Sequence, residues 1–327
     1  MKDAVLTLGF PTFNRSAVLD HTLRKSIKNL KGLDVPVKFL ISDNASSDNT
    51  TEVLARIQAE FDFIDLEIMS QERNIGFAGN LISLIENCQT EYICLISDED
   101  FIKDSLSISS LNRFLTVNSP LFCSSLLLKD GILYRGSRKN TTIKVNNLRS
   151  SCSYLSGIVF SVHFAKTILV RFKTKILEKF FLYPQFFILN ELFVYDSKRI
   201  FYLNKEIVTL GPEETTAITS NSLPYWTLEQ RWQQTLIYHR FYADRLTDVS
   251  LDDGRKSLVK ILQDQNLRMF YRLMKHAINT EAPEAWVGIR HGVLLTEGGW
   301  ALVIFCKIKD FFRRIVTPAL RRIRNLS

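Results

Sequence analysis

Three carboxylates follow one another in the stretch LISDEDFI, where Asp98, Glu99 and Asp100 come directly after the apolar run 92–96. Like charges at such short range repel one another, and burying them is unfavourable unless a positive partner lies nearby. Carboxylate oxygens are also the ligands that hard divalent cations prefer. The three carboxylates therefore lead us to expect a cation or a cation-bearing ligand at the end of a buried strand.

Three more polar clusters each follow an apolar, strand-like run: PTFNR (11–15), DNASSDNT (43–50) and ERNIGFAGN (72–80). In a parallel α/β sheet, ligands bind beyond the carboxyl ends of the strands, so we expect all four clusters to converge at one edge. The segment NIGFAGN has neither the GxGxxG spacing of a dinucleotide site nor the GKS or GKT ending of a P-loop. Neither of these two phosphate-binding motifs applies.

The elements that would position these clusters alternate along the first 130 residues. Strand-like apolar runs lie at 4–9, 37–42, 64–69, 92–97 and 121–128. Between them apolar residues recur at helical spacing, with stripes at Leu19, Leu23, Ile27 and Leu30, at Val53, Leu54 and Ile57, and at Leu81, Leu84, Ile85 and Cys88. Asp48 is suitably placed to cap the second helix. The alternation predicts an α/β domain with a doubly wound, mostly parallel sheet.

The four clusters, in this order and at these intervals, resemble the motifs of family-two glycosyltransferases, whose fold is called GT-A. PTFNR resembles the first-strand motif of that family, SDNASSDNT its D-x-S-x-D segment, NIGFAGN its N-x-G-x-x-x-N segment and SDED its acidic metal motif. More loosely, SYLSGIVFSVHF (153–164) resembles the acceptor-side strand of polysaccharide-assembling members such as abequosyltransferase-like enzymes. The resemblance implies an inverting transfer of sugar from a nucleoside diphosphate sugar to a hydroxyl of a glycan or lipid-linked acceptor.

The resemblance also implies roles for the residues of the clusters. Asp43 can accept a hydrogen bond from the imide N–H of uracil or a similar base edge. Asp98 and Asp100 would hold one Mg²⁺ or Mn²⁺, which neutralises charge on the departing diphosphate as a Lewis acid. The other residues implied in donor binding are Pro11, Thr12, Asn14, Arg15, Asn74, Gly76, Asn80 and Glu99.

The general base of such an inverting transferase is not evident in this chain. Family members place an Asp shortly before a late strand, here 199–208, and that position falls on Gln185, whose amide cannot act as a base. Glu191 lies six residues further on, which is roughly 240° around a helix. Other candidate carboxylates are Asp196, Glu213 and Glu214.

Two further features have competing interpretations. His163, in the strand-like IVFSVHF, has no Asp or Cys at ligand spacing nearby, so a core or edge residue is the simpler interpretation. The aromatic cluster KFFLYPQFF (179–187) would either stack on an acceptor sugar or pack in the core.

Beyond the predicted GT-A domain of residues 1–210, the pattern changes. Residues 211–226 are polar, with two prolines, and indicate a loop or lid, while helical stripes indicate a helical extension over 227–290. Residues 291–327 form an amphipathic basic tail. Its segment 307–324 holds seven basic and one acidic side chain, +6 of the net charge of +8. Together with its apolar side, this predicts contact with an anionic membrane surface and no nucleic-acid binding.

Composition sets the remaining limits. Hydrophobic residues make up 46% and charged residues 23% of the 327, as in ordinary globular proteins. The five cysteines form no CxxC pair, which favours reduced thiols in a cytosolic protein. No signal peptide or spanning helix is expected, so we predict a cytoplasmic protein, peripheral at the inner face of the cell membrane.

Two other functions fit parts of the sequence. A sugar nucleotidyltransferase also uses an α/β sheet and metal-binding carboxylates, but it usually carries a glycine-rich basic loop near its N-terminus, which PTFNR does not provide. A catalytically inactive, transferase-like scaffold would explain why Gln185 replaces the expected Asp.

Overall fold

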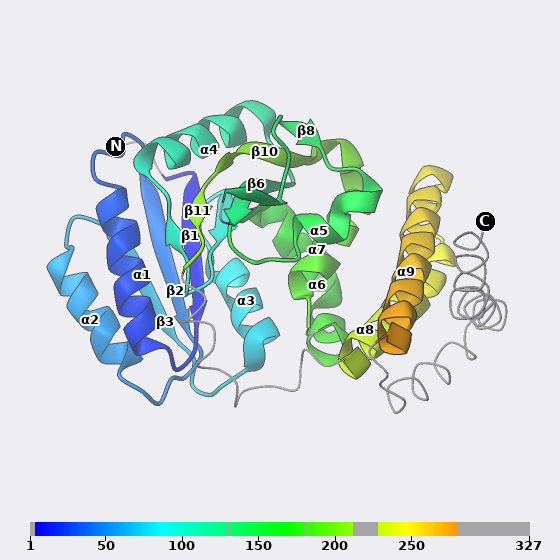
Figure 1. Ribbon diagram of the computed structural model, residues 1–327, viewed down its shortest axis with the longest axis horizontal. Coiled ribbons are helices and arrows are strands. Elements are labelled where there is room, and N and C mark those ends of the chain that lie inside the picture. Colours follow the sequence, from blue (N-terminus) through cyan, green and yellow to red (C-terminus); the bar gives the residue numbers. More distant parts are fainter. Residues whose placement is uncertain (1–3, 130, 181, 212–227, 280–327) are drawn as a thin grey trace, which may run out of the picture. The chain divides into compact units, whose positions relative to one another are not determined.

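The computed structural model describes residues 4–129, 131–180, 182–211 and 228–279 (Figure 1). The chain divides into two compact units, with the boundary between Asn221 and Ser222. The first unit is built on one large sheet, and the described part of the second is a pair of helices.

The large sheet has the strand order β3-β2-β1-β4-β9-β6-β10-β8, with β7 pairing on β6. Its strands are β1 Leu6–Thr12, β2 Val37–Asp43, β3 Asp65–Ser70, β4 Tyr92–Leu95, β6 Phe122–Lys129, β7 Ile132–Arg135, β8 Thr141–Thr142, β9 Ile158–Ser161 and β10 Ile200–Glu206. β1 is parallel to both β2 and β4, β2 to β3, and β6 to β10, whereas β9 is antiparallel to both β4 and β6. The predicted doubly wound, mostly parallel sheet is confirmed.

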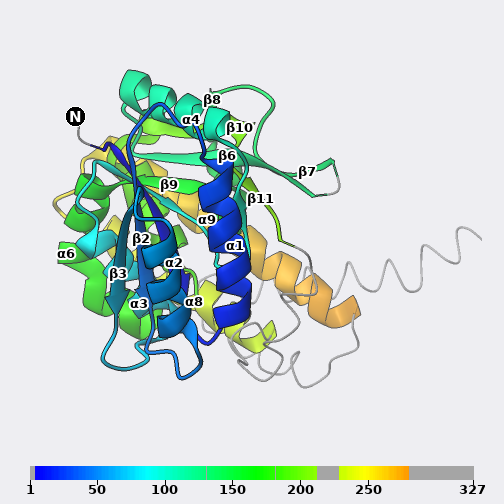
Figure 2. The ribbon, with the colours of Figure 1, turned by 90° about the vertical axis from the view of Figure 1, so that its left-hand side faces the viewer.

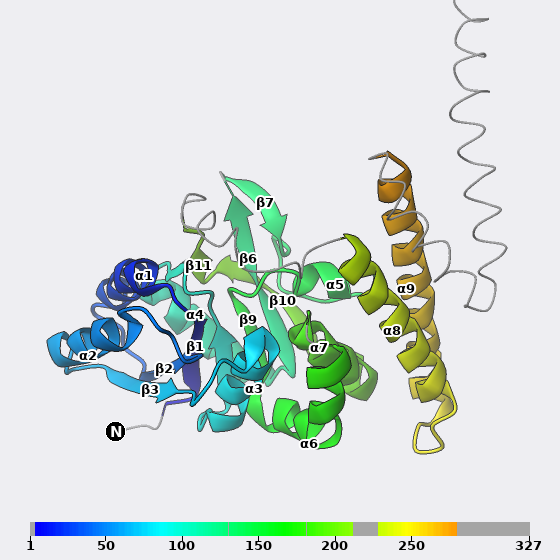
Figure 3. The same cartoon turned by 90° about the horizontal axis from the view of Figure 1, so that it is seen from below.

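Helices cover both faces of this sheet. The helices of the first unit are α1 Ser16–Asn29, α2 Thr50–Glu60, α3 Gly76–Asn87, α4 Ser105–Asn118, α5 Leu148–Ser151, α6 Val162–Lys179 and α7 Pro184–Asp196. The apolar sides of α1, α2 and α4 join one core cluster with β1 and β2, while α3 and α7 pack with α6 (Figure 3). With helices on both faces, every residue of β1 is buried, which explains its continuous apolar sequence.

The strand β1 lies at the point where the strand order reverses, because the chain runs from β1 outward to β2 and β3 and then returns to β4 on the other side. Ligands of doubly wound sheets bind at the carboxyl ends of the strands flanking such a point. Here β1 ends at Thr12 and β4 at Leu95. The segments at the ends of these two strands, PTFNR and SDED, therefore lie next to each other.

Several local predictions change once the chain is folded. β1 extends to Thr12, so Pro11 and Thr12 lie within the strand, paired with Ser42 and Asp43, rather than in the loop after it. α3 begins at Gly76, so the second half of NIGFAGN is helix. The placement of His163 in a strand is wrong, because β9 ends at Ser161 and α6 begins at Val162.

Other pairings have no counterpart in the predicted elements. The short strand β5 (Phe101–Ile102) pairs antiparallel with β11 (Val208–Thr209), in a separate two-stranded sheet. This pairing brings the chain back beside the acidic stretch SDED. The four cysteines among the described residues, Cys88, Cys94, Cys123 and Cys152, are buried and free.

The second unit contains α8 (Leu228–Leu246) and α9 (Asp253–Asn279), which pack against each other, and it confirms a helical C-terminal region. The side chain of Asn266 donates to the carbonyl oxygen of Thr235 at 2.7 Å and so ties α9 to α8. Within the described ranges, every helix is too short or too polar to cross a bilayer. The predicted lid, the candidates Glu213 and Glu214, and the basic tail fall at 212–227 and 280–327, outside the described residues.

Gly157 lies just before β9, and a substitution there tests how closely its backbone packs against β6. Its φ is +78°, and a Cβ there would lie 2.1 Å from the Ser125 hydroxyl oxygen. We expect Gly157→Ala to lower the free energy of unfolding by roughly 3 kcal/mol, from backbone strain and overpacking together. The matched control is Gly32→Ala, at φ +77° with open space around it, which should cost only about 1 kcal/mol. Equal losses in urea unfolding would contradict the close packing at Gly157.

Candidate active site

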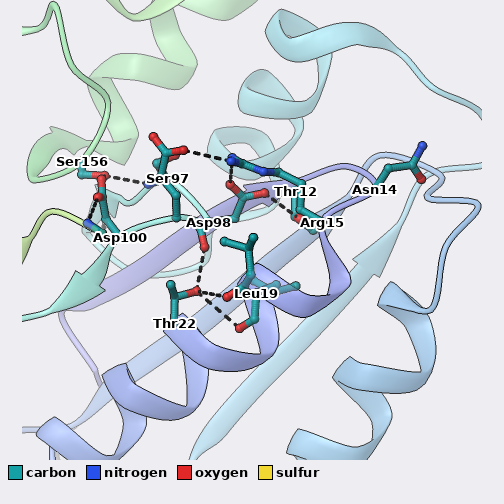
Figure 4. A network of polar contacts seen from close by, with 12 residues as sticks. Thr12, Asn14, Arg15, Leu19, Thr22, Ser97, Asp98, Asp100 and Ser156 are labelled. Atoms are coloured by element: carbon teal, nitrogen blue, oxygen red, sulfur yellow. Dashed lines mark hydrogen bonds and ion pairs between the residues drawn. The ribbon is translucent and has the colours of Figure 1, made fainter. Parts of the chain in front are cut away.

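The acidic stretch after β4 is held by residues from the end of β1 and from the segment that follows it (Figure 4). The Thr12 hydroxyl donates to one carboxylate oxygen of Asp98 at 2.9 Å, and Nη1 of Arg15 donates to the other at 2.6 Å. Nη2 of Arg15 donates to Glu99 at 3.0 Å. The Thr22 hydroxyl, from α1, donates to the backbone carbonyl of Asp98 at 2.6 Å. The first and last of the four polar clusters thus form one network.

Burial and charge oppose each other in this network. Burial raises the pKa of Asp98 from 3.8 to about 6, although the Arg15 charge and the Thr12 hydrogen bond work against the shift. Burial also opposes the charge of Arg15, but Asp98 and Glu99 outweigh it and raise the pKa of the guanidinium. Part of the positive charge that the acidic stretch requires is therefore supplied by the chain itself.

Asp100 faces a different set of donors. It is fully buried, with Oδ2 accepting from the Ser156 hydroxyl at 2.5 Å and Oδ1 accepting from the backbone N–H of Gly211 at 2.8 Å. The N–H of Ser97 donates in turn to the Ser156 hydroxyl oxygen at 2.8 Å. Burial raises the pKa of Asp100, and these hydrogen bonds oppose the rise. On the same segment as Ser156, the Tyr154 hydroxyl donates to Glu99 at 3.2 Å.

The loop after β2 is tied to the loop after β1. Asn14, with φ +52°, accepts from the N–H of Ser47 at 2.7 Å through its side chain and donates its own N–H to the Ser46 hydroxyl at 2.8 Å. Asp43 is almost fully buried at the end of β2, and its Oδ1 accepts from the N–H and the hydroxyl of Ser46. The side-chain hydrogen bonds of Asp43 within the described residues all involve Oδ1, while its backbone carbonyl accepts from the N–H of Gln71.

Asp48 also joins these loops, because its carboxylate accepts from the backbone N–H groups of Ser16, at the start of α1, and of Thr50, at the start of α2. These bonds lower the pKa of Asp48, although burial opposes them. The predicted contact with the start of α2 is present, although the residue at the N-cap position itself is Asn49.

The third cluster, NIGFAGN, is fixed by side-chain amides. The Asn44 side chain donates to the Asn74 side-chain oxygen at 2.9 Å, and that oxygen also accepts from the N–H of Gly76 at 2.8 Å. Asn80 is buried and donates to the carbonyl of Ser42 at 3.0 Å. Asn80 is therefore occupied with holding α3 on the sheet, while Asn74 shapes the turn into α3.

The residues proposed around the general base lie on a different element. Gln185, at the start of α7, is buried and donates to the carbonyl of Cys152 at 3.4 Å. Glu191, on the same helix, is also buried. Asp196 accepts from the N–H of Lys198 and caps the short 3-10 turn Ser197–Arg199. The identity of the base remains a prediction, since Glu213 and Glu214 lie outside the described residues.

The donor set suits a divalent cation that arrives with a substrate. Among the described residues, no group of three or more His, Cys, Asp or Glu side chains is arranged as a metal cage. Mg²⁺ commonly takes only one or two protein carboxylates and completes its shell with substrate phosphates and water. Asp98 and Asp100 offer hard oxygen atoms of this kind. The residues therefore fit a cation shared with a diphosphate.

Sequence reasoning missed four further residues that hold the acidic stretch: Thr22, Tyr154, Ser156 and Gly211. Tyr154 and Ser156 lie in SYLSG, which the sequence indicates only as the beginning of a strand. A serine followed by a glycine indicates a tight local turn, and Gly157 does adopt a positive φ in the structure. Nothing in the sequence indicates that this turn faces Asp100.

Known proteins resemble both the sequence and the fold. Residues 7–158 match Glycosyl transferase family 2. A GalNAc(5)-diNAcBac-PP-undecaprenol beta-1,3-glucosyltransferase of Campylobacter jejuni is 26% identical over 167 residues, 50% of this chain and 52% of that protein. The abequosyltransferase RfbV of Salmonella typhimurium is 29% identical over 105 residues, 32% of this chain and 31% of that protein. The chain thus matches about half or less of these relatives.

Solved structures support the fold alone, because their sequence identity is low. TarS of S. aureus, in complex with UDP-GlcNAc, has a TM-score of 0.63 at 12% identity, over 91% of this chain and 83% of that one. The mannosyltransferase PcManGT of Pyrobaculum calidifontis, in complex with GDP-Man and Mn²⁺, has a TM-score of 0.52 at 12% identity, over 96% and 82%. The predicted GT-A architecture is confirmed.

The ion pair of Arg15 with Asp98 and Glu99 predicts a pH-dependent cost for removing the guanidinium. We expect Arg15→Met to lower the free energy of unfolding by about 3 kcal/mol near neutral pH, because buried carboxylates lose their counter-charge. The folded pKa of Asp98 already lies above its ordinary value and should rise further in the variant. The deficit should therefore shrink as the pH falls from the raised pKa of Asp98 in the variant to below about 6, where Asp98 is protonated in both folded proteins.

The control for this experiment is Arg24→Met, because Arg24 also bridges two carboxylates, Asp20 and Glu60, but near the surface. That variant should lose less than about 1 kcal/mol. Urea unfolding at several pH values measures both. A deficit in Arg15→Met that stays constant from neutral to acidic pH would contradict the charge argument.

Proposed function

Because residues 7–158 form a Glycosyl transferase family 2 domain, we propose that the protein is an inverting glycosyltransferase that uses a nucleoside diphosphate sugar. The observation that carries the proposal is the network of Thr12, Arg15, Asp98 and Asp100 at the switch point of the sheet. The family match covers the residues of this network, and the topology of the sheet gives their position. Both indicate a donor site at the carboxyl ends of β1 and β4.

In this proposal the loop after β2 recognises the base of the donor. Asp43 uses Oδ1 to hold Ser46, while no hydrogen bond within the described chain reaches Oδ2. That oxygen is free to accept from a base N–H such as the imide of uracil. Asn14, Asn74 and Gly76 border the same region and would contact the base and the ribose, and Pro11 and Asn80 would set the position of the strands beneath them.

The acidic stretch would bind the diphosphate. Asp98 and Asp100 supply the protein ligands of one Mg²⁺ or Mn²⁺, with Glu99 beside them. When bound, the cation would act as a Lewis acid on the leaving diphosphate. The structure of PcManGT, which holds GDP-Man and Mn²⁺ together, supports this arrangement. Arg15 would orient Asp98 and offset part of the remaining negative charge.

For the acceptor, we propose a hydroxyl of a glycan or lipid-linked glycan used in surface-polysaccharide assembly. The name of the Campylobacter relative specifies an undecaprenol-linked substrate for that protein. A basic tail at 291–327 that contacts an anionic membrane surface would keep a cytoplasmic enzyme at the inner face of the membrane, near such an acceptor. No role in nucleic-acid binding is proposed.

The alternative of an inactive scaffold rests on Gln185, because an amide in the expected position of the base cannot remove a proton. Turnover of UDP-linked and GDP-linked sugars, with detection of the glycosylated product, separates the two functions. A scaffold would bind nucleotide without forming product. An enzyme would form product through a carboxylate such as Glu191, or through one of the candidates outside the described residues.

The role of Asp100 can be tested by a change that keeps its shape. We expect Asp100→Asn to leave the fold intact but to abolish Mn²⁺-dependent binding of UDP or GDP, because an amide lacks the charge that a hard cation requires. Calorimetry with and without Mn²⁺ measures this. Asp65→Asn, at an exposed position on β3, is the control and should bind as the wild type does. Unchanged metal-dependent affinity in Asp100→Asn would remove this carboxylate from the proposed site.

The role of Asp43 calls for a different substitution. Asp43→Asn retains an oxygen that can accept from Ser46 and replaces the other oxygen with an NH₂ group, which cannot accept from a base N–H. We expect a higher KM for the donor and little change in kcat, because the contact is used equally in the ground state and the transition state. Steady-state kinetics would measure both constants. A large fall in kcat at unchanged KM would assign Asp43 to the chemical step instead.

A further inference from the structure

A buried arginine outside the predicted clusters holds the segment that contacts Asp100. Arg135 is the last residue of β7, is 3% exposed, and has no carboxylate partner among the described residues. Its guanidinium donates instead to backbone carbonyls, from Nη1 to Tyr154 at 2.7 Å and from Nη2 to Ser156 at 2.6 Å. Longer contacts of 3.4 Å reach the carbonyl and the hydroxyl of Ser125 on β6. Burying an unpaired charge is costly, so this position calls for a structural explanation.

The rest of β7 does not explain the burial of Arg135. Ile132, Leu133 and Tyr134 are 72%, 43% and 55% exposed, and the hairpin of β6 and β7 projects from the sheet (Figure 2). Arg135 is the one residue of this strand that is buried. The strand β7 therefore adds few apolar side chains to the core. It contacts the interior through the guanidinium of Arg135.

The segment that Arg135 holds is the one that contacts two of the three carboxylates. Tyr154 donates its hydroxyl to Glu99, and Ser156 donates its hydroxyl to Asp100. At the far end of the segment, the N–H of Gly157 donates to the carbonyl of Leu95, the last residue of β4. The backbone oxygens of residues 154 and 156 accept from Arg135, while their side chains reach the acidic stretch.

We propose that Arg135 is a positioning residue of the donor site, which fixes residues 154–157 so that Ser156 and Tyr154 hold Asp100 and Glu99 for the cation and the diphosphate. The inference rests on the proposed function and extends it to a residue that never contacts the donor. The planar fork of a guanidinium can donate to two carbonyls at once in fixed directions, whereas a lysine ammonium is a single point of charge. Arg135→Lys thus keeps a nitrogen donor on a long side chain and removes the fork.

The effect of Arg135 should pass through Ser156. Without the fork, the two carbonyls lose their partners, residues 154–157 lose their fixed position, and the Ser156 hydroxyl no longer holds Asp100 in one orientation. We expect Arg135→Lys and Ser156→Ala each to weaken Mn²⁺-dependent nucleotide binding by about tenfold or more, as loss of outer-shell partners does at metal sites. The affinity of the double variant for nucleotide should equal that of the single variant with the lower affinity, because both changes break the same chain of contacts.

The experiment measures binding of UDP and GDP with Mn²⁺ by calorimetry for the full chain, both single variants and the double variant. Arg199→Lys is the matched control, since the Arg199 guanidinium also donates to a backbone carbonyl, that of Ser119, and it should bind as the wild type does. Losses that multiply in the double variant, or unchanged binding in Arg135→Lys, would overturn the proposal.

Hydrogen exchange without nucleotide tests the positioning independently. In Arg135→Lys, the amides of Ser97 and Gly157 should exchange faster, while those of β2 should not change, which also shows that the variant is folded. Unchanged exchange at Ser97 and Gly157 would overturn the proposal that Arg135 fixes residues 154–157. If the wild type binds neither nucleotide under any Mn²⁺ condition, the proposed function fails, and the exchange result alone then decides whether Arg135 holds the segment.

Discussion

The ion pair between Arg15 and the carboxylates after β4 is the contact on which the candidate site depends. Asp98 and Arg15 are far apart in the sequence, but β1 and β4 run parallel and side by side, so the two residues leave the sheet at the same edge. Without the guanidinium, a largely buried Asp98 next to Glu99 would have to take up a proton or move to solvent. The parallel pairing of two strands thus makes an otherwise self-repelling sequence compatible with a folded core.

This arrangement also leaves charge to be balanced. Arg15 carries one positive charge and the acidic stretch three negative ones, a formal total of −2 when all are ionised. Burial raises the pKa of both Asp98 and Asp100, so the free protein resists the fully ionised state. A divalent cation would restore neutrality and favour ionisation of both groups. The hydroxyls of Thr12 and Ser156 orient the same carboxylates without adding charge.

How much of this could be predicted depends on whether the relevant contacts are local. Alternating apolar runs and helical stripes predicted β1 to β4, the parallel sheet and the meeting of the polar clusters, because each signal lies within one element. Strand direction is not a local property, so the antiparallel direction of β9 was missed, although a strand was expected there. The point where this strand gives way to α6, before His163, was missed as well. Arg135 would ordinarily be interpreted as a surface charge, since arginine is rarely buried unless paired. Its contacts with residues 154 and 156 exist only in the folded chain.

The helix that carries the predicted position of the base differs from the proposed donor site in what its side chains do. α7 is buried along almost its whole length, from Pro184 to Val194, so its side chains serve packing first. Gln185 holds the carbonyl of Cys152 through its amide nitrogen, and its side-chain oxygen has no hydrogen-bond partner among the described residues. An amide oxygen can orient a hydroxyl through a hydrogen bond, but it cannot take the proton. Under the proposed function, the base must therefore be a second group, with Glu191, Asp196 and the carboxylates outside the described residues as the candidates.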